Sequence, residues 1–118
     1  MSQTHQALDI SAEVARIHAA ADEHGFEPVK TTLDAEQAIC TLRFVLSPAE
    51  QVLISHRYED SVHDQREAFE QVLAPTLSAA VERATGRTVA TFLTATHLRA
   101  GITLLIFMFA PAAAPLVR

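Results

Sequence analysis

The feature that most constrains this chain is its C-terminal stretch, RAGITLLIFMFAPAAAPLVR, which has no charge between Arg99 and Arg118. A membrane helix needs about 20 predominantly apolar residues. Here the dense apolar run covers only residues 102–109, and Pro111 and Pro115 follow it. As a helix this run would span only about 12 Å of a hydrocarbon layer roughly 30 Å thick. Because β-branched and aromatic residues dominate the run, we predict a strand of a globular domain.

This predicted strand is apolar on both faces, because side chains alternate along a strand. One face carries Ile102, Leu104, Ile106 and Met108. The other face carries Leu105, Phe107 and Phe109. Leaving such a face in water forgoes about 1.5–3 kcal/mol per large side chain. We therefore expect the second face to lie in an interface between two copies of the chain, a homodimer; helices on both faces of the sheet are the alternative.

Periodicity and capping signals predict the other elements. Apolar residues recur at helical spacing over residues 8–24, and residues 26–32 and 38–46 are typical of strands. Ser47-Pro48-Ala49-Glu50 forms a capping box with proline at the first helical position, which opens a short helix to about residue 56. A long helix over about 60–84 follows, which Pro75 should kink or divide, and a strand over 87–95 comes next.

These elements predict one α+β domain over residues 1–118, with flexible tails at 1–6 and 111–118. Its four-stranded, mainly antiparallel sheet has helices packed on it, in the order α-β-β-α-α-β-β. The order also resembles, superficially, a KH-type nucleic-acid module. That module clamps its nucleic-acid strand with a Gly-x-x-Gly loop, which this sequence lacks.

Charge and cysteine content narrow the class of protein. The net charge of −5 repels phosphate backbones and anionic headgroups, and the nine Lys and Arg residues are scattered singly. We predict neither nucleic-acid binding nor direct membrane insertion.

The N-terminal stretch has no basic start and no apolar core of a signal peptide, so we expect a cytoplasmic protein. Cys40 stands alone within an apolar run, which favours a small buried side chain over a reactive thiol.

Six histidines raise the question of a metal site. His56 and His63 would share a helix face only if one helix ran unbroken between them. His63, Asp64 and Glu67 offer nitrogen and oxygen ligands within one helical turn. Neither His-Glu-x-x-His nor Cys-x-x-Cys is present, so we predict no metal and no cofactor, and keep these four residues as the candidate ligands. Cys40, or Ser55 beside His56, lacks a recognisable third catalytic partner, so no catalytic residue is assigned.

Three stretches together resemble a known family. They are Leu46-Ser47-Pro48-Ala49-Glu50 after a hydrophobic strand, VERATGRTV at residues 81–89, and the apolar strand at 102–109. Their order and spacing resemble the MpsC-like (YbcI-like) family of small bacterial proteins over about residues 8–110. The resemblance implies a link to a sodium-translocating, membrane-potential-generating system, whose membrane partners are associated with inorganic-carbon uptake. The chain departs from the family pattern after the third strand, where Ala95 and Thr96 replace an acidic residue.

The resemblance and the lack of catalytic signatures suggest a non-enzymatic cytoplasmic accessory or regulatory protein. We expect it to work by binding, with a membrane cation-translocating or inorganic-carbon uptake system as its partner. The alternative is a His-dependent enzyme or sensor that binds a metal or a small ligand. A third class is a self-associating module with no small ligand.

Overall fold

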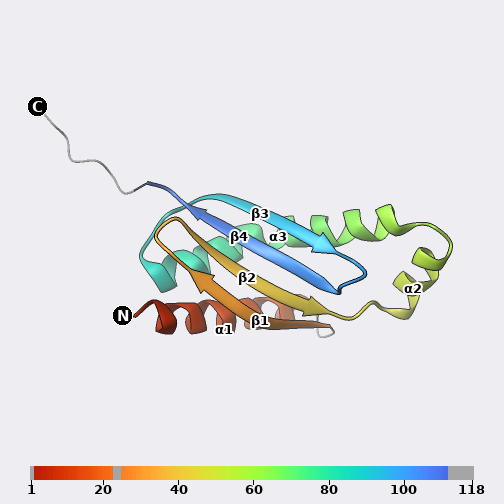
Figure 1. The fold of residues 1–118 in the computed structure, drawn as a ribbon, viewed down its shortest axis with the longest axis horizontal. Helices are drawn as coiled ribbons and strands as arrows, with labels where there is room; N and C mark the ends of the chain where they lie inside the picture. Colours follow the sequence, from red (N-terminus) through yellow and green to blue (C-terminus); the bar gives the residue numbers. More distant parts are fainter. Residues whose placement is uncertain (1, 23–24, 112–118) are drawn as a thin grey trace, which may run out of the picture.

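The computed structural model describes residues 2–22 and 25–111, which form three helices and four strands in the predicted order (Figure 1). Helix α1 (Gln3–Ala21) is followed by strands β1 (Phe26–Leu33) and β2 (Gln37–Phe44). Helices α2 (Pro48–Ser55) and α3 (Glu59–Thr85) come next, and strands β3 (Val89–His97) and β4 (Ile102–Phe109) complete the fold. The predicted α+β class and the predicted strand over 102–109 are confirmed.

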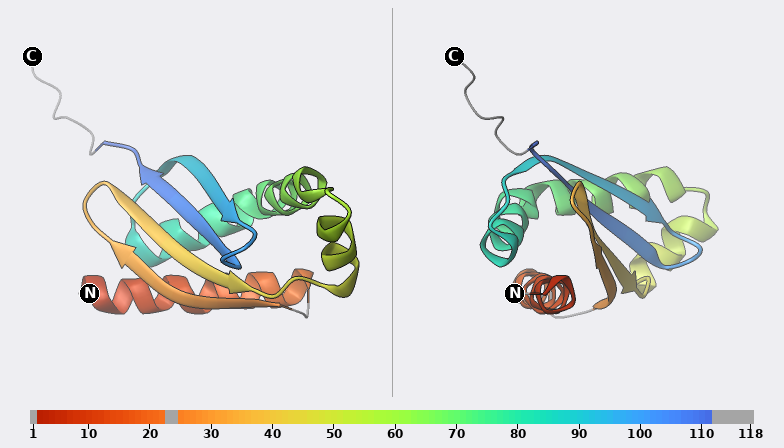
Figure 2. Two further views of the ribbon diagram at one scale, coloured as in Figure 1. Left: turned by 45° about the vertical axis from the view of Figure 1, so that its right-hand side comes forward. Right: turned by 60° about the vertical axis from the view of Figure 1, so that its left-hand side comes forward.

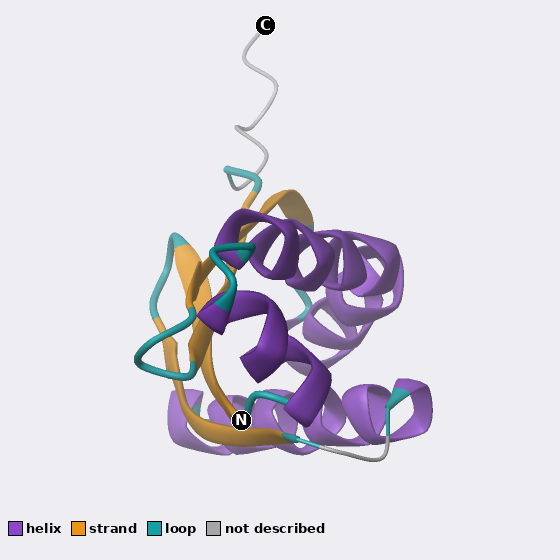
Figure 3. Cartoon of the chain, turned by 90° about the vertical axis from the view of Figure 1, so that its right-hand side faces the viewer, coloured by secondary structure: helices purple, strands orange, loops and turns teal. Residues whose placement is uncertain are grey.

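The four strands form one antiparallel sheet in the order β1-β2-β4-β3. Helices α1 and α3 lie side by side on one face of this sheet, and α2 crosses one end of the molecule (Figures 2 and 3). The opposite face carries no helix in the described part of the chain; we call it the open face. The fold is therefore two layers, with the sheet covered on one side.

The hydrophobic core lies between the helices and the sheet. Its largest contributions are Ile10, Val14 and Ile17 from α1, Leu77, Ala80 and Val81 from α3, and Cys40 and Leu42 from β2. Phe107 of β4 is fully buried there, and its ring contacts the ring of Phe92 on β3 at 5.2 Å between centroids. Burial of these side chains is the main stabilising term of the fold.

The structure reverses the predicted role of the two faces of β4. Leu105, Phe107 and Phe109, predicted to form an interface, lie in the core against the helices. Thr103 is buried on the same face, whereas Ile102, Leu104, Ile106 and Met108 lie on the open face and are half-buried or exposed. The interface assignment of Leu105, Phe107 and Phe109 was wrong because both faces of this strand are apolar, so periodicity alone does not tell which face the helices cover.

Several elements differ from prediction in their extent. Helix α1 begins at Gln3, because Ser2 caps it by accepting a hydrogen bond from the His5 backbone N–H at 3.2 Å; residues 3–6 are therefore helical and not a tail. Helix α3 continues through Pro75 as one element, so the predicted division is absent there. Strand β3 extends to His97. Of the tail predicted at 111–118, residues 112–118 lie outside the described residues.

Within residues 2–22 and 25–111, none of the helices has both the length and the apolar character that crossing a membrane demands.

Candidate functional site

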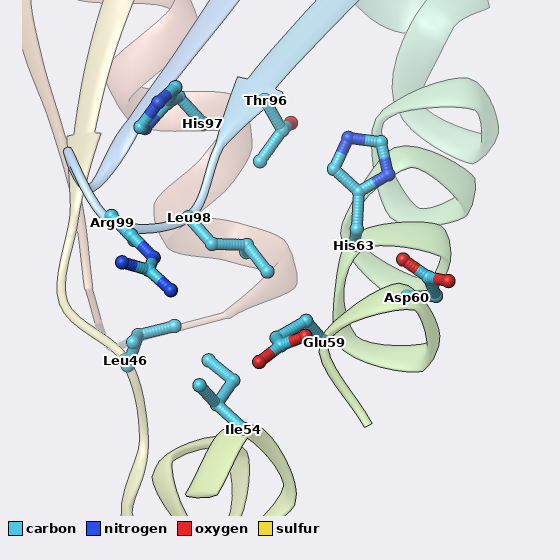
Figure 4. A pocket seen from close by; sticks show the side chains of 9 residues that line it. All are labelled: Leu46, Ile54, Glu59, Asp60, His63, Thr96, His97, Leu98 and Arg99. Carbon is cyan, nitrogen blue, oxygen red and sulfur yellow. The ribbon is translucent and has the colours of Figure 1, made fainter. Parts of the chain in front are cut away.

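A pocket of about 360 Å³ opens at the end of the molecule where α2, the start of α3 and the β3–β4 turn meet (Figure 4). Leu46, Ile54 and Leu98 supply apolar parts of its lining. Arg99 and Glu59 point into it from its two sides (Figure 4). Its volume falls in the range of small-molecule sites, and its lining combines apolar contact with charges of both signs.

The capping box predicted at Ser47 begins helix α2, which forms one wall of this pocket through Ile54. The Ser47 hydroxyl accepts from the Glu50 backbone N–H at 3.1 Å, and the Glu50 carboxylate accepts from the Ser47 backbone N–H at 2.8 Å. These bonds start α2 at Pro48, after only three residues that follow the end of β2. Arg57, with φ at 67°, then turns the chain from α2 into α3.

Arg66 of α3 holds α2 in this position. Its guanidinium donates two hydrogen bonds of 2.8 Å to the Glu50 carboxylate and lies over the Phe44 ring, 3.8 Å from the centroid. Partial burial opposes ionisation of Glu50, but the hydrogen bonds from Arg66 and Ser47 outweigh it and hold the pKa of the carboxyl below its ordinary value. The pair joins α2, α3 and β2 at one point.

The β3–β4 turn forms the opposite wall and depends on Gly101. This residue has φ at +66°, and a Cβ placed there would lie 2.8 Å from the Phe44 carbonyl oxygen. The Gly101 carbonyl accepts from the Phe44 backbone N–H at 2.8 Å. Only glycine permits both the left-handed backbone and this close approach. The turn that carries Leu98 and Arg99 is thereby fixed against the end of β2.

Of the four candidate metal ligands, His63 lies near Asp64 and Glu67 on α3, whereas His56 lies apart from them. His63 lines the pocket, with Nε2 at 3.5 Å from Glu67 and Nδ1 at 3.8 Å from Asp64. His56 lies beyond the end of α2, where its Nδ1 is 2.9 Å from the Val52 carbonyl of its own helix. Because the chain turns at Arg57, no continuous helix aligns His56 with His63. Across residues 2–22 and 25–111 no group of three or more His, Cys, Asp or Glu side chains is placed to hold a metal ion.

Ser55 and His56 are adjacent but are not arranged as a nucleophile and its base. The Val52 carbonyl can only accept, so the His56 Nδ1 at 2.9 Å must carry a proton and donate. The Ser55 hydroxyl donates to the same carbonyl at 2.9 Å. With its nearer nitrogen protonated, His56 does not activate Ser55 through this contact.

Cys40 is buried in the core, as its sequence context predicted. Burial, and to a lesser extent the Glu70 charge, raise the pKa of its thiol, against a smaller opposing effect of the Thr31 hydrogen bond. The neutral thiol is therefore the stable form at neutral pH, which is the inert state of cysteine.

A buried ionisable pair, His18 of α1 and Glu70 of α3, was not predicted. Both residues are 1% exposed, and His18 Nε2 lies 2.8 and 3.0 Å from the two Glu70 oxygens. Its Nδ1 lies 2.9 Å from the Val14 carbonyl, which can only accept, so Nδ1 carries a proton. The contact to Glu70 needs one further proton, on Nε2 or on the carboxyl. In either case the pair has no net charge, which makes its burial tolerable.

The pair joins the two helices beneath a group of aromatic rings. The Phe26 and Phe69 rings stack with their centroids 5.6 Å apart, and the His18 ring lies 4.9 Å from Phe26. The sequence does contain a signal for the His18–Glu70 pair, which is the helical spacing of these two polar residues from buried apolar ones. His18 follows Val14 by four positions, and Glu70 lies eight after the buried Val62, so both fall on inward helix faces. Histidine and glutamate at such positions are usually solvated, so the pattern alone did not single them out.

The chain matches the model of one known protein family. A family model described as "Na+-translocating membrane potential-generating system (MpsC)" matches residues 3–111. No curated protein and no solved structure matches the chain.

Proposed function

The chain belongs to the MpsC family, and from this premise we propose that it is a non-enzymatic accessory or regulatory protein of a cation-translocating membrane system. The observation that carries the proposal is the family match, which covers nearly the whole chain. The resemblance seen in the sequence extends the expected partners to inorganic-carbon uptake systems. In this proposal the protein acts from the cytoplasm by binding a membrane transporter subunit, and its working unit is a homodimer.

Two features of the structure support binding rather than catalysis. The Cys40 thiol is buried with a raised pKa, and the Ser55 hydroxyl is hydrogen-bonded to its own helix beside a histidine that does not activate it. The exposed apolar side chains of the open face, Leu93 and Met108, are 46% and 39% exposed. Exposed apolar surface of this kind is typical of proteins that work by association.

The test is recovery of the partner from native membranes. Full-length tagged protein should retain a multispanning cation-transport subunit when membranes are solubilised in mild detergent and washed. Deletion of the gene should lower the Na⁺-dependent membrane potential, and re-expression of the wild-type chain should restore it. An unchanged potential in the deletion strain would contradict the proposal. Turnover of a small substrate that is lost on His63→Ala or Asp64→Asn would contradict it as well.

A second candidate function, a sensor of a small ligand, is favoured by the pocket. Arg99 and Glu59 face one space with apolar side chains between them, an arrangement that suits a small molecule carrying both charges. Metal analysis of the purified protein and a thermal-shift screen of small zwitterions separate the two functions. Stoichiometric metal, or stabilisation by a zwitterion that is lost in Arg99→Gln but kept in the surface control Arg16→Gln, would favour the sensor.

A further inference from the structure

The open face carries a continuous apolar patch built from three strands. Directly paired residues on neighbouring strands form rows across the sheet. In one row, Ile39 of β2 and Leu93 of β3 both pair with Ile106 of β4. The neighbouring row places Leu104 of β4 beside Ala95 of β3. Ile102 and Met108 extend the patch toward the two ends of β4. This patch, the β4 patch, consists of Ile39, Leu93, Ile102, Leu104, Ile106 and Met108.

The charges of the open face lie to one side of the β4 patch. Glu27 and Lys30 belong to β1, the edge strand, and Arg43 stands at the end of β2, where it is registered with Glu27. Opposite charges on directly paired positions of neighbouring strands attract each other. Glu27 and Lys30 thus occupy the β1 margin, and Arg43 lies beside Ile102 at one end of the patch. Strands β4 and β3 carry no charged residue on this face apart from His97 at the end of β3.

We propose that two copies of this chain pack face to face through the β4 patch, with β4 of one copy crossing β4 of the other at a two-fold axis. The occupant is a second copy because the patch is centred on an inner strand and is self-complementary about it. The two-fold axis lies between the two sheets and runs nearly along β4, so the two β4 strands cross at a small angle. It places Ile39 of each copy over Leu93 of the other copy. The same rotation carries Glu27 and Lys30 of β1 beyond the β3 edge of the other sheet, where they remain in water. It places Arg43 of β2 over the end of β3 in the other copy, at the rim of the interface.

The size of the open face fits this occupant. The three strands that face the other copy, β2, β4 and β3, have about eight residues at roughly 3.3 Å per residue and lie about 4.8 Å apart, so they form a face of about 26 by 14 Å. With the relief of the side chains, such a face buries of the order of 1,000 Å² in the two copies together, which is at the low end of specific interfaces. Two sheets packed in this way form a sandwich with interdigitated side chains, a common arrangement of antiparallel sheets.

This inference rests on the homodimer of the proposed function but not on its membrane partner, so the two fail separately. Sedimentation or light scattering of the full chain should give twice the 12.8 kDa mass of one chain. Ile106→Lys puts a charge at the centre of the patch and should weaken the dimer at least about tenfold, because a charge is costly in an apolar contact. Leu93→Lys, at a more exposed position, is the second variant in case Ile106→Lys does not fold.

Val72→Lys is the matched control, because Val72 lies on α3 and is 77% exposed, away from the sheet. It should leave the dimer unchanged. A wild-type chain that is monomeric at the highest attainable concentration would overturn the inference. A dimer that survives Leu93→Lys and a folded Ile106→Lys variant, or that Val72→Lys dissociates, would overturn it too.

Thiol cross-linking tests the crossing of β4 on β4. Facing sheets pack about 10 Å apart, beyond the reach of a disulfide, so a bifunctional thiol reagent about 10 Å long is used. Ile106→Cys should cross-link into dimers, while Val72→Cys and the wild type, whose Cys40 is fully buried, should not. A monomeric chain whose Leu93→Lys variant loses a membrane protein that the wild type retains would assign the patch to that protein and overturn the homodimer, leaving the proposed membrane partnership intact.

Discussion

At the scale of single residues, the buried His18–Glu70 pair links α1 to α3 through hydrogen-bond contacts within the core. Removing one partner leaves the other buried without its hydrogen bonds, which in proteins costs about 3–5 kcal/mol. We expect Glu70→Ala and His18→Ala each to lower the free energy of unfolding by an amount in this range. Denaturant unfolding of each variant measures the loss, with His5→Ala as control, because the His5 side chain is 61% exposed.

The joint replacement distinguishes a pair from two separate contacts. In His18→Leu/Glu70→Leu no buried charge or unpaired donor remains, so the double variant should lose clearly less than the sum of the two single leucine variants. Additive losses would show that the two side chains do not act as a unit.

Glu50 gives the molecule a pH dependence whose sign follows from its pKa. The pKa is lowered from the ordinary 4.5, so the stabilisation by Glu50 is present above the unfolded value and is lost as pH falls through the lower folded value. Glu50→Gln should cost about 1 kcal/mol near neutral pH, since the pair with Arg66 is partly exposed, and progressively less below about pH 4.5. Urea unfolding of both proteins between about pH 3 and 7 measures the difference.

Arg66→Met is the companion variant, because it removes the partner that lowers the Glu50 pKa. Its loss relative to the wild type should shrink over the same acidic range. A difference between the wild type and Glu50→Gln that does not change with pH would show that the carboxylate charge is not what joins α2 to α3.

At the scale of elements, the β3–β4 turn and the end of α3 each require a glycine, for different reasons. Gly101 needs both a positive φ and the space beside the Phe44 carbonyl, whereas a Cβ at Gly86, with φ at +70°, would have nothing within 4 Å. Gly86→Ala should therefore cost only the left-handed conformation, about 1–2 kcal/mol. Gly101→Ala should cost clearly more, measured by thermal or denaturant unfolding. Equal losses would contradict the close approach of the turn to β2.

The elements also show which parts of the fold could be derived from sequence. Ser47 and Glu50 predicted the start of α2 correctly, because both partners of a capping box lie within four residues. Ser2 was missed as a cap, since no strong apolar pattern follows it at once. Leu105 and Ile106 lie on opposite faces of β4 and are equally apolar, so the covered face depends on where α1 and α3 pack. His18 and Glu70 are 52 positions apart in the chain, and only the tertiary fold brings them together.

At the scale of the whole molecule, the order β1-β2-β4-β3 determines which backbone is most protected. Strands β2 and β4 are paired on both sides, while β1 and β3 each have one edge that pairs with no other strand among the described residues. We expect amide hydrogen exchange to be slowest in β2 and β4, faster in β1 and β3, and fastest in α2, which packs on the rest through few side chains. Mass spectrometry of exchanged peptides measures this order. Protection in β3 equal to that in β4 would indicate that a further strand covers the β3 edge.

The inner position of β4 has a consequence for how the chain is made. The ribosome releases β1, β2 and β3 before β4, yet β4 is the strand that pairs with both β2 and β3. Until β4 emerges, the two N-terminal strands and β3 have no hydrogen-bonding connection, and the apolar sides of α1 and α3 lack their central covering strand. A nascent chain that has released residues 1–101 can therefore pair β1 with β2 but cannot complete the four-stranded sheet, and the apolar surface left uncovered at this stage favours aggregation.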